Sequence, residues 1–200
     1  MKGERFFAPF FDGVDAPAAL RSFILTELSS SARHWHGLLH HALMLRQVNA
    51  MGEAQRGLVL AILFHDVVYD AQRTDNEEAS AEVARRWLSA DDADAVAPLI
   101  LATKTHDLAS ADAVTRTLLE ADLAVLWTSS AALYRFYASG IRAEYAHVPD
   151  AAYRAGRAAV LRRLQDTLAA QLDAERRASL ARNLDWERLQ LQTGSFDVQR

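Results

Sequence analysis

The chain has no cysteine and no long apolar run, and each absence excludes a class of protein. Without cysteine there are neither disulfide bonds nor thiolate metal ligands, which fits a reducing compartment such as the cytoplasm. The longest apolar run, LVLAILF at 58–64, is far shorter than the ~20 residues of a transmembrane helix. The first residues, MKGERFFAPFFDG, lack the apolar stretch of a signal peptide. We therefore expect a cytoplasmic protein that has no membrane partner.

Proline and glycine are also scarce, at four and eight among 200 residues, whereas alanine, leucine and arginine are abundant. This composition favours helices, and no alternation typical of strands persists along the chain. An excess of basic residues is missing as well, because the net charge is −4 and no stripe of lysine and arginine is interleaved with aromatic residues. Nucleic acid is therefore not an expected partner.

Helical periodicity predicts an all-α protein, a single-domain helical bundle over residues 1–200. The predicted helices cover 16–29, 33–50, a segment ending near Asp66, the residues after Asp75, a segment running to about His106, 111–126, 129–147, 150–171 and 173–190. We expect residues of about 33–125 to form the core that carries the functional site, with the helices at about 129–190 packed on it. The segments FFAPFF and NLDWERLQLQ either pack within the chain or form the surface of a homodimer.

The stretch LAILFHDVVYD at 60–70 raises the question of function, because a helix that reads as buried ends on His65 and Asp66. An uncompensated buried polar group costs about 2–7 kcal/mol, and a charge costs more. A hydrogen bond, an ion pair or a metal ion must therefore satisfy these two side chains.

Other polar residues of the same types lie in apolar surroundings. His36 and His40 are four residues apart in RHWHGLLHH and would share one face of a helix. His106 ends the apolar stretch LILATKTH, and Asp122 lies within LLEADLAVLW. The remaining histidines of RHWHGLLHH, His34 and His41, point elsewhere on that helix and are expected at the surface.

Each of these residues also has an ordinary structural interpretation. A histidine on a helix is commonly packed or solvated, Asp66 could cap the following turn, and Asp122 could pair with Arg116 or Arg142. Several such coincidences are better explained together, since imidazole and carboxylate are the ligands that a divalent cation takes when no thiolate is available. The sequence therefore predicts a site for Mn, Mg, Fe, Co, Ni or Zn and leaves open whether one ion or two are bound.

The order of His40, the His65–Asp66 pair and Asp122 on successive helices resembles the HD superfamily of metal-dependent phosphohydrolases. The segments RHWHGLLHH, AILFHDVVYD, NEEASAEVA, LILATKTHD, LLEADLAVL, IRAEYAHV and AGRAAVLRRL, within about 33–165, are similar to its small members described as predicted metal-dependent phosphohydrolases. The resemblance implies a helical bundle of the HD-domain type and a metal held by His40, His65, Asp66 and Asp122. It also implies hydrolysis of a nucleotide or other small phosphorylated molecule by a metal-activated water.

A second likeness concerns catalytic roles. HWHGLLHHA is similar to the Y-H-N-x-x-H-A stretch of cyclic-nucleotide phosphodiesterases, although Gly37 replaces the asparagine. It implies that His36 is the general acid and that His40 is a metal ligand, and we infer no cyclic-nucleotide specificity from it. Tyr69, shortly after the His-Asp pair, either stacks on a base or closes the loop.

The remaining candidates are weighed against a structural role. Glu77, in DNEEAS, is a candidate general base or one of the acidic residues that favour the first turn of a helix. His106 is a candidate ligand of a second metal or a phosphate contact, and otherwise caps a helix end. Lys104, Arg142 and Arg157 are candidate phosphate-binding residues, and otherwise lie on solvated helix faces.

Two functions are therefore open. The first is a metal-dependent phosphohydrolase, and the second is a noncatalytic sensor module in which the same bundle binds metal and nucleotide. The presence of all the predicted ligands together with His36 favours the enzyme.

Overall fold

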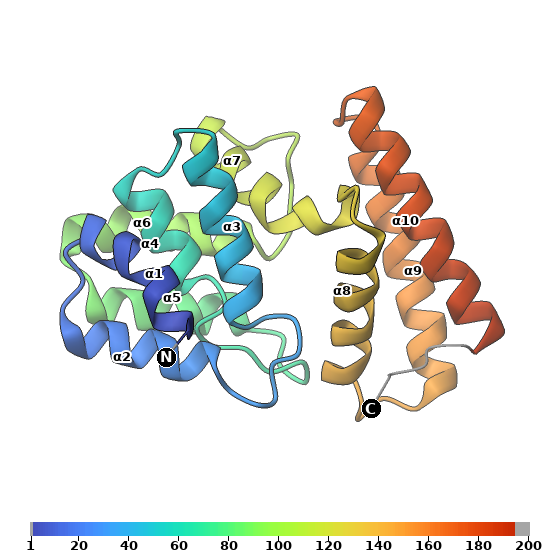
Figure 1. The fold of residues 1–200 in the computed structure, drawn as a ribbon, viewed down its shortest axis with the longest axis horizontal. Helices are drawn as coiled ribbons and strands as arrows, with labels where there is room; N and C mark the ends of the chain where they lie inside the picture. Colours follow the sequence, from blue (N-terminus) through green and yellow to red (C-terminus); the bar gives the residue numbers. More distant parts are fainter. Residues whose placement is uncertain (1, 195–200) are drawn as a thin grey trace. The chain divides into compact units, whose positions relative to one another are not determined.

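The computed structural model of the chain describes residues 2–194 and, within them, contains ten α-helices, one short 3-10 helix and no strand (Figure 1). The all-α prediction is confirmed. The helices are α1 (Lys2–Gly13), α2 (Ala18–Leu28), α3 (Leu38–Ala50), α4 (Arg56–Phe64), α5 (Asn76–Trp87), α6 (Ala90–Ala102), α7 (Ala113–Leu123), η1 (Ala124–Trp127), α8 (Ala131–Glu144), α9 (Asp150–Leu168) and α10 (Ala174–Thr193).

The chain divides into two compact units, Met1–Asp122 and Leu123–Arg200. The first unit contains α1 to α6 and nearly all of α7, and the second contains η1 and the last three helices. All four predicted metal ligands belong to the first unit. The packing of the C-terminal helices on the core that carries the site stays a prediction.

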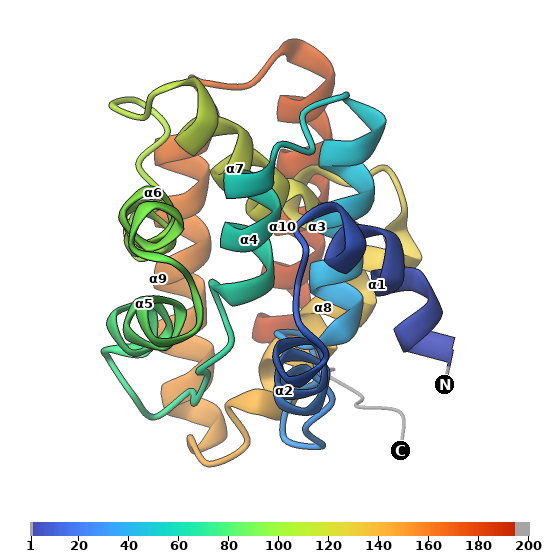
Figure 2. The same cartoon turned by 90° about the vertical axis from the view of Figure 1, so that its left-hand side faces the viewer.

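The core of the first unit is built around α4. Every residue of the apolar run at 58–64 is buried, so this helix is apolar on all sides and needs neighbours around its whole circumference. Helices α3, α5 and α6 contact it, and Figure 2 shows α4 between α3 on one side and α5 with α6 on the other. Burial of each large apolar side chain contributes about 1.5–3 kcal/mol to the stability of the fold. The packing of α4 therefore fixes the position of His65 and Asp66, which directly follow it.

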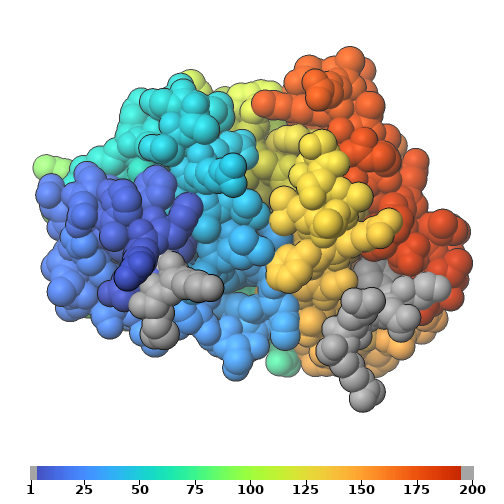
Figure 3. All heavy atoms as spheres, viewed as in Figure 1, coloured from blue at the N-terminus to red at the C-terminus, as the bar shows by residue number. Residues whose placement is uncertain are grey.

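The N-terminal segment forms a helix that the sequence did not predict. In α1, Phe7 and Phe11 are one helical turn apart, each is about 1% exposed, and both belong to the core of the unit. The space-filling view shows α1 on the outside of this unit, beside α3, with which it makes contact (Figure 3). These two rings of FFAPFF therefore pack within the chain, whereas Phe6 is 38% exposed.

The start of α3 differs from the prediction, because the helix begins at Leu38 and not near residue 33. The residues before it form a turn in which the Gly37 N–H donates a hydrogen bond to the Trp35 carbonyl at 2.7 Å. A Cβ at position 37 would lie 2.9 Å from the Leu28 carbonyl oxygen, so this turn lies directly against the end of α2. At the start of α6, the Ser89 side chain caps the helix by accepting a hydrogen bond from the Asp92 N–H.

In the second unit, α10 contacts η1, α8 and α9. Its buried face carries Glu187, which binds Arg157 of α9 and Tyr134 of α8. Within residues 2–194, no helix is both long and apolar enough to cross a membrane.

Candidate metal centre

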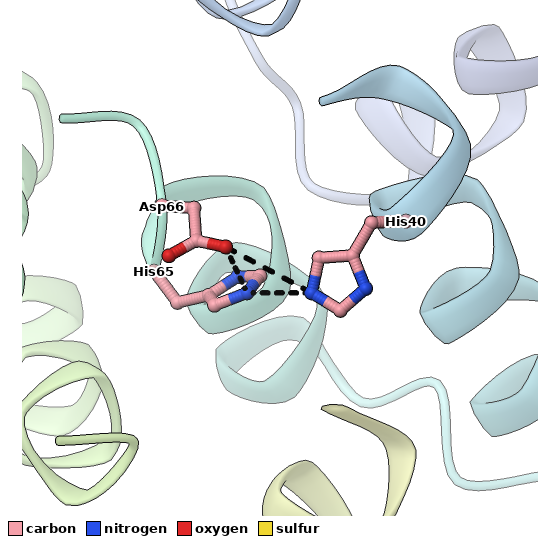
Figure 4. A group of neighbouring side chains, drawn as sticks. All are labelled: His40, His65 and Asp66. Carbon is pink, nitrogen blue, oxygen red and sulfur yellow. Dashed lines mark hydrogen bonds and ion pairs between the residues drawn. The ribbon is translucent and has the colours of Figure 1, made fainter. Parts of the chain in front are cut away.

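Three of the predicted metal ligands, His40, His65 and Asp66, form one group in the first unit, and Asp122 lies beside its two histidines. His40 comes from the first turn of α3, His65 and Asp66 directly follow α4, and Asp122 lies near the end of α7. Figure 4 shows the side chains of His40, His65 and Asp66 directed toward one another. The His40 Nε2 atom lies 3.2 Å from His65 Nε2 and 3.1 Å from Asp122 Oδ1, and His65 Nε2 lies 3.0 Å from Asp66 Oδ2. The structure thus brings together ligands that are as much as 82 residues apart in the chain.

The distances among the ligand atoms of His40, His65 and Asp66, and those from Asp122 to the two histidines, are compatible with a common cation. Ligand atoms about 2.1 Å from one metal ion are roughly 3.0–3.4 Å apart when adjacent and about 4.2 Å apart when opposite. The two longer separations, His40 Nε2 to Asp66 Oδ2 at 3.8 Å and His65 Nε2 to Asp122 Oδ1 at 4.0 Å, stay within that range. Two imidazole nitrogens and two carboxylate oxygens suit several divalent transition metals. The residues present therefore fit a divalent cation.

The end of α4 sets the orientation of the His65 ring. The His65 N–H donates to the Ala61 carbonyl at 2.9 Å, so the backbone still follows the helix at this residue. Its Nδ1 lies 2.9 Å from the Ile62 carbonyl, which can only accept, so Nδ1 carries a proton. A backbone carbonyl of this kind commonly orients a metal-binding histidine and directs Nε2 toward the ion.

Burial and charge act in opposite directions on the two histidines. Burial lowers the pKa of His40 and outweighs the hydrogen bond and charge of Asp122, which raise it. Burial also lowers the pKa of His65, but the charge and hydrogen bond of Asp66, followed by the charge of Asp122, raise that pKa to about 9. A proton on His65 therefore lies between two carboxylates.

The two carboxyl groups are ionised. Burial raises the pKa of Asp66, yet the neighbouring histidines, His65 first, outweigh it and hold that pKa well below its ordinary value. Burial likewise raises the pKa of Asp122, and hydrogen bonds from His106 and His40 hold it well below. With two negative charges and one proton, the cluster carries excess negative charge that a divalent cation would offset.

His106 contacts the other oxygen of Asp122. Its Nε2 lies 2.8 Å from Asp122 Oδ2, and its side chain is about one-third exposed. α6 ends at Ala102, and the His106 N–H donates to the Ala102 carbonyl at 3.2 Å, so His106 lies at the end of that helix as its structural interpretation expected. His106 has a φ of 52°, a left-handed conformation that costs a non-glycine residue about 1–3 kcal/mol. In this strained conformation the ring contacts Asp122.

His36 lies beside the cluster, although it precedes α3 and does not share a helical face with His40 as predicted. Its half-buried ring stacks on Tyr69, with centroids 4.2 Å apart and planes 24° apart. The His36 and His40 ring centroids are 5.9 Å apart. The Tyr69 ring thus packs on His36, and its two interpretations, stacking on a base and closing the loop, stay predictions.

The prediction for His41 is wrong, because this residue is fully buried, whereas His34 is exposed as expected. The His41 Nδ1–H donates to the Gly37 carbonyl at 3.0 Å, and burial lowers its pKa well below the ordinary value. His41 has helical spacing with the buried residues Met44, Leu45 and Val48 of α3, and this periodicity could have predicted its burial.

The candidate phosphate-binding residues are engaged by other groups. The Lys104 ammonium donates to Glu78 and to the Thr74 carbonyl, next to the start of α5. Arg142 and Arg157 belong to the second unit, where Arg142 binds Asp150 and Arg157 binds the buried Glu187. Each of the three side chains therefore already has a partner within the protein. Phosphate binding by these residues stays a prediction.

Glu77 and Asp122 had alternative structural interpretations. Glu77 lies in the first turn of α5, as that interpretation expected, and its role as a general base stays a prediction. Of the two alternative partners of Asp122, the Arg116 guanidinium binds Glu120 and the Leu108 carbonyl, and the Arg142 guanidinium binds Asp150. Asp122 instead faces His40 and His106.

One residue beside the site carries no signal in the sequence. The Arg33 guanidinium donates to the backbone carbonyls of both His36 and Asp66. Arginine is common in the predicted helices of this chain, so the sequence offered no reason to single out Arg33.

Comparisons of the chain with family models, with curated proteins and with solved structures gave no match.

Proposed function

We propose that the chain is a metal-dependent phosphohydrolase that acts on a nucleotide or another small phosphorylated molecule. The observation that carries the proposal is the group of His40, His65 and Asp66, whose ligand atoms are separated by 3.0–3.8 Å, with Asp122 Oδ1 at 3.1 Å from His40 Nε2. The order of these residues, which resembles the HD superfamily, supports the same reaction. A cytoplasmic location is part of the proposal, because a chain without cysteine suits a reducing compartment.

A divalent cation in this cluster would stabilise charge on the phosphoryl group and lower the pKa of a water ligand from 15.7 toward about 7. The protein's own groups supply the rest. His36 is the proposed donor of a proton to the leaving oxygen, and its half-buried ring, which lies beside His40 and stacks on Tyr69, supports this role. His106 holds the second oxygen of Asp122, which keeps the first oxygen directed at the cluster.

The test separates metal binding from catalysis. The full chain is stripped of metal, reloaded with Mn²⁺, Co²⁺ or Ni²⁺, analysed for bound metal and assayed on nucleotides and small phosphate esters. We expect Asp66→Ala to lose metal and turnover, and His36→Ala to keep the metal while losing turnover. His34→Ala is the matched control, since His34 is an exposed histidine of the same segment and should retain both properties.

Two outcomes would contradict the proposal. A folded wild-type protein that takes up none of these ions would remove the metal centre itself. Stoichiometric metal without hydrolysis of any substrate in the panel, combined with a nucleotide that raises the melting temperature only when metal is present, would favour the noncatalytic sensor.

A further inference from the structure

Arg33 joins the two chain segments that carry the candidate catalytic groups. Its Nη1 donates to the His36 carbonyl at 3.0 Å and also to the Asp66 carbonyl, and its Nη2 donates to the Val67 carbonyl at 2.8 Å. One guanidinium thereby links the turn before α3 to the residues that follow α4, 33 and 34 positions later in the chain.

We infer that Arg33 is a positioning residue of the metal centre, which holds the backbone segments of His36 and Asp66 in the relative position that the site needs. The inference rests on the proposed function. Arginine suits this role because its planar group offers several N–H donors in a fixed fork, whereas lysine is a compact charge on a flexible chain.

Both segments need such a tether because neither is inside a helix. The carbonyls of Asp66 and Val67 follow Phe64, the last residue of α4, and therefore take no part in the hydrogen bonds within that helix. Arg33 binds the carbonyls of Asp66 and Val67, and the Ser80 hydroxyl of α5 binds both the N–H and the carbonyl of Val68 at 3.1 and 3.2 Å. The backbone after the His-Asp pair is thus held from two sides.

Arg33 also supports the His36 ring. The guanidinium carbon lies 5.8 Å from the centroid of the Tyr69 ring, and that ring stacks on His36. A cation near an aromatic face is attracted by about 0.5–1 kcal/mol at exposed sites and by more when desolvated. The same side chain therefore orders both the backbone and the ring of the candidate acid.

The charge of Arg33 allows positioning to be distinguished from electrostatics. A positive group near a cation site repels the metal, so its removal alone would tighten metal binding. Loss of a tether has the opposite effect, because Asp66 and His36 would no longer be held. Arg33→Gln, which removes the charge, and Arg33→Lys, which keeps the charge without the fork, should therefore both weaken metal binding.

The experiment titrates the metal-stripped full chain with Mn²⁺ and records the absorption spectrum of the Co²⁺ complex, which reports ligand geometry. We expect Mn²⁺ affinity to fall about 10–100-fold in both Arg33 variants, the range typical for groups that orient metal ligands, with a changed Co²⁺ spectrum. Arg21→Lys is the matched control, because Arg21 also donates to a backbone carbonyl, that of Ala16, in the same unit. It should leave affinity and spectrum unchanged.

Hydrogen exchange of the metal-stripped proteins gives a readout that does not depend on metal. We expect faster exchange in peptides covering 33–38 and 65–69 of either folded Arg33 variant, and wild-type exchange in Arg21→Lys. If Arg33→Lys does not fold, Arg33→Gln decides the matter.

Different results would overturn the positioning role of Arg33 and the proposed phosphohydrolase function. Wild-type protein that binds Mn²⁺, together with a folded Arg33 variant of equal or higher affinity, overturns the positioning role alone. Unchanged exchange in the two segments also overturns it, whatever the metal result. Wild-type protein that binds neither ion overturns the proposed function, and with it the inference about Arg33.

Discussion

Each of the two units contains a buried cluster of charged groups, and the clusters differ in how their charges are balanced. In the second unit, Glu187 is fully buried, and its carboxylate accepts from Arg157 Nε at 2.7 Å and from the Tyr134 hydroxyl at 2.6 Å. The Arg157 Nη2 donates to Glu187 as well and to the Tyr137 hydroxyl at 3.0 Å. Donors face acceptors throughout, and one positive charge meets one negative charge.

The cluster of the first unit is not balanced in this way. Two imidazole nitrogens, those of His40 and His65, face each other at 3.2 Å, and two carboxylates point at them. Two ionised carboxylates therefore meet one protonated histidine in a place where His40 and His65 are each about 1% exposed. The comparison teaches that a buried cluster whose charges balance suits a structural role, whereas a buried excess of negative charge is compatible with a cation.

The largest effect is expected in the second unit, where Glu187→Ala leaves the Arg157 charge buried without its carboxylate. Removal of one partner of a buried ion pair costs about 3–5 kcal/mol, and we expect a loss of that size in the free energy of unfolding. Denaturant unfolding of the full chain measures it. The double variant Glu187→Leu with Arg157→Leu should recover much of the loss, and a double variant as unstable as the single one would contradict the structural interpretation of this cluster.

The next effect is stabilisation of the first unit by metal. A cation at 100 times its dissociation constant should add about 2.7 kcal/mol to the free energy of unfolding of wild-type protein. Asp122→Asn, which keeps the shape but removes a charged ligand, should abolish this increment, and thermal melts with and without Mn²⁺ measure it. An equal increment in Asp122→Asn would show that the ion binds elsewhere.

Gly37→Ala tests the turn that precedes α3. The added methyl group would meet the Leu28 carbonyl oxygen at 2.9 Å, and overpacking of this kind costs about 1–3 kcal/mol. We expect lower stability in denaturant unfolding, together with weaker metal binding, because the displaced turn carries His36. Gly57→Ala is the control, since a Cβ there meets no atom within 4 Å, and it should not destabilise the protein. Equal stability of the two variants would contradict the tight approach at position 37.

The smallest predicted effect is the change in the free energy of metal binding per pH unit. His65 has a pKa of about 9 beside Asp66, so a cation must displace its proton at lower pH. Between pH 7 and 9 the Mn²⁺ affinity should therefore rise about tenfold per pH unit, which is about 1.4 kcal/mol, and level off above pH 9. Calorimetry in two buffers of different ionisation enthalpy should detect the release of one proton at pH 7.5. An affinity that does not change over this range would show that His65 is already neutral.

Local patterns in the sequence were sufficient for most helices and for the types of the ligands. The apolar run at 58–64 predicted a buried helix, and α4 is that helix. The same reasoning failed at α1, where Phe7 and Phe11 are ordered by packing against the core, and at residues 34–37, where contact with the end of α2 replaces helix by a turn. Both failures occur where a tertiary contact outweighs weak local preference.

The sequence by itself determined that the chain is helical and that the buried helix ends on His65 and Asp66, because both follow from the spacing of neighbouring residues. Only the tertiary structure decided which distant groups complete the cluster. It brings His40, 25 residues earlier, and Asp122, 56 residues later, to His65 and Asp66, and it turns Arg33 toward the carbonyls after α4. Contacts over such separations depend on how the helices pack around α4, and helical periodicity specifies which face of a helix is buried but not its neighbour.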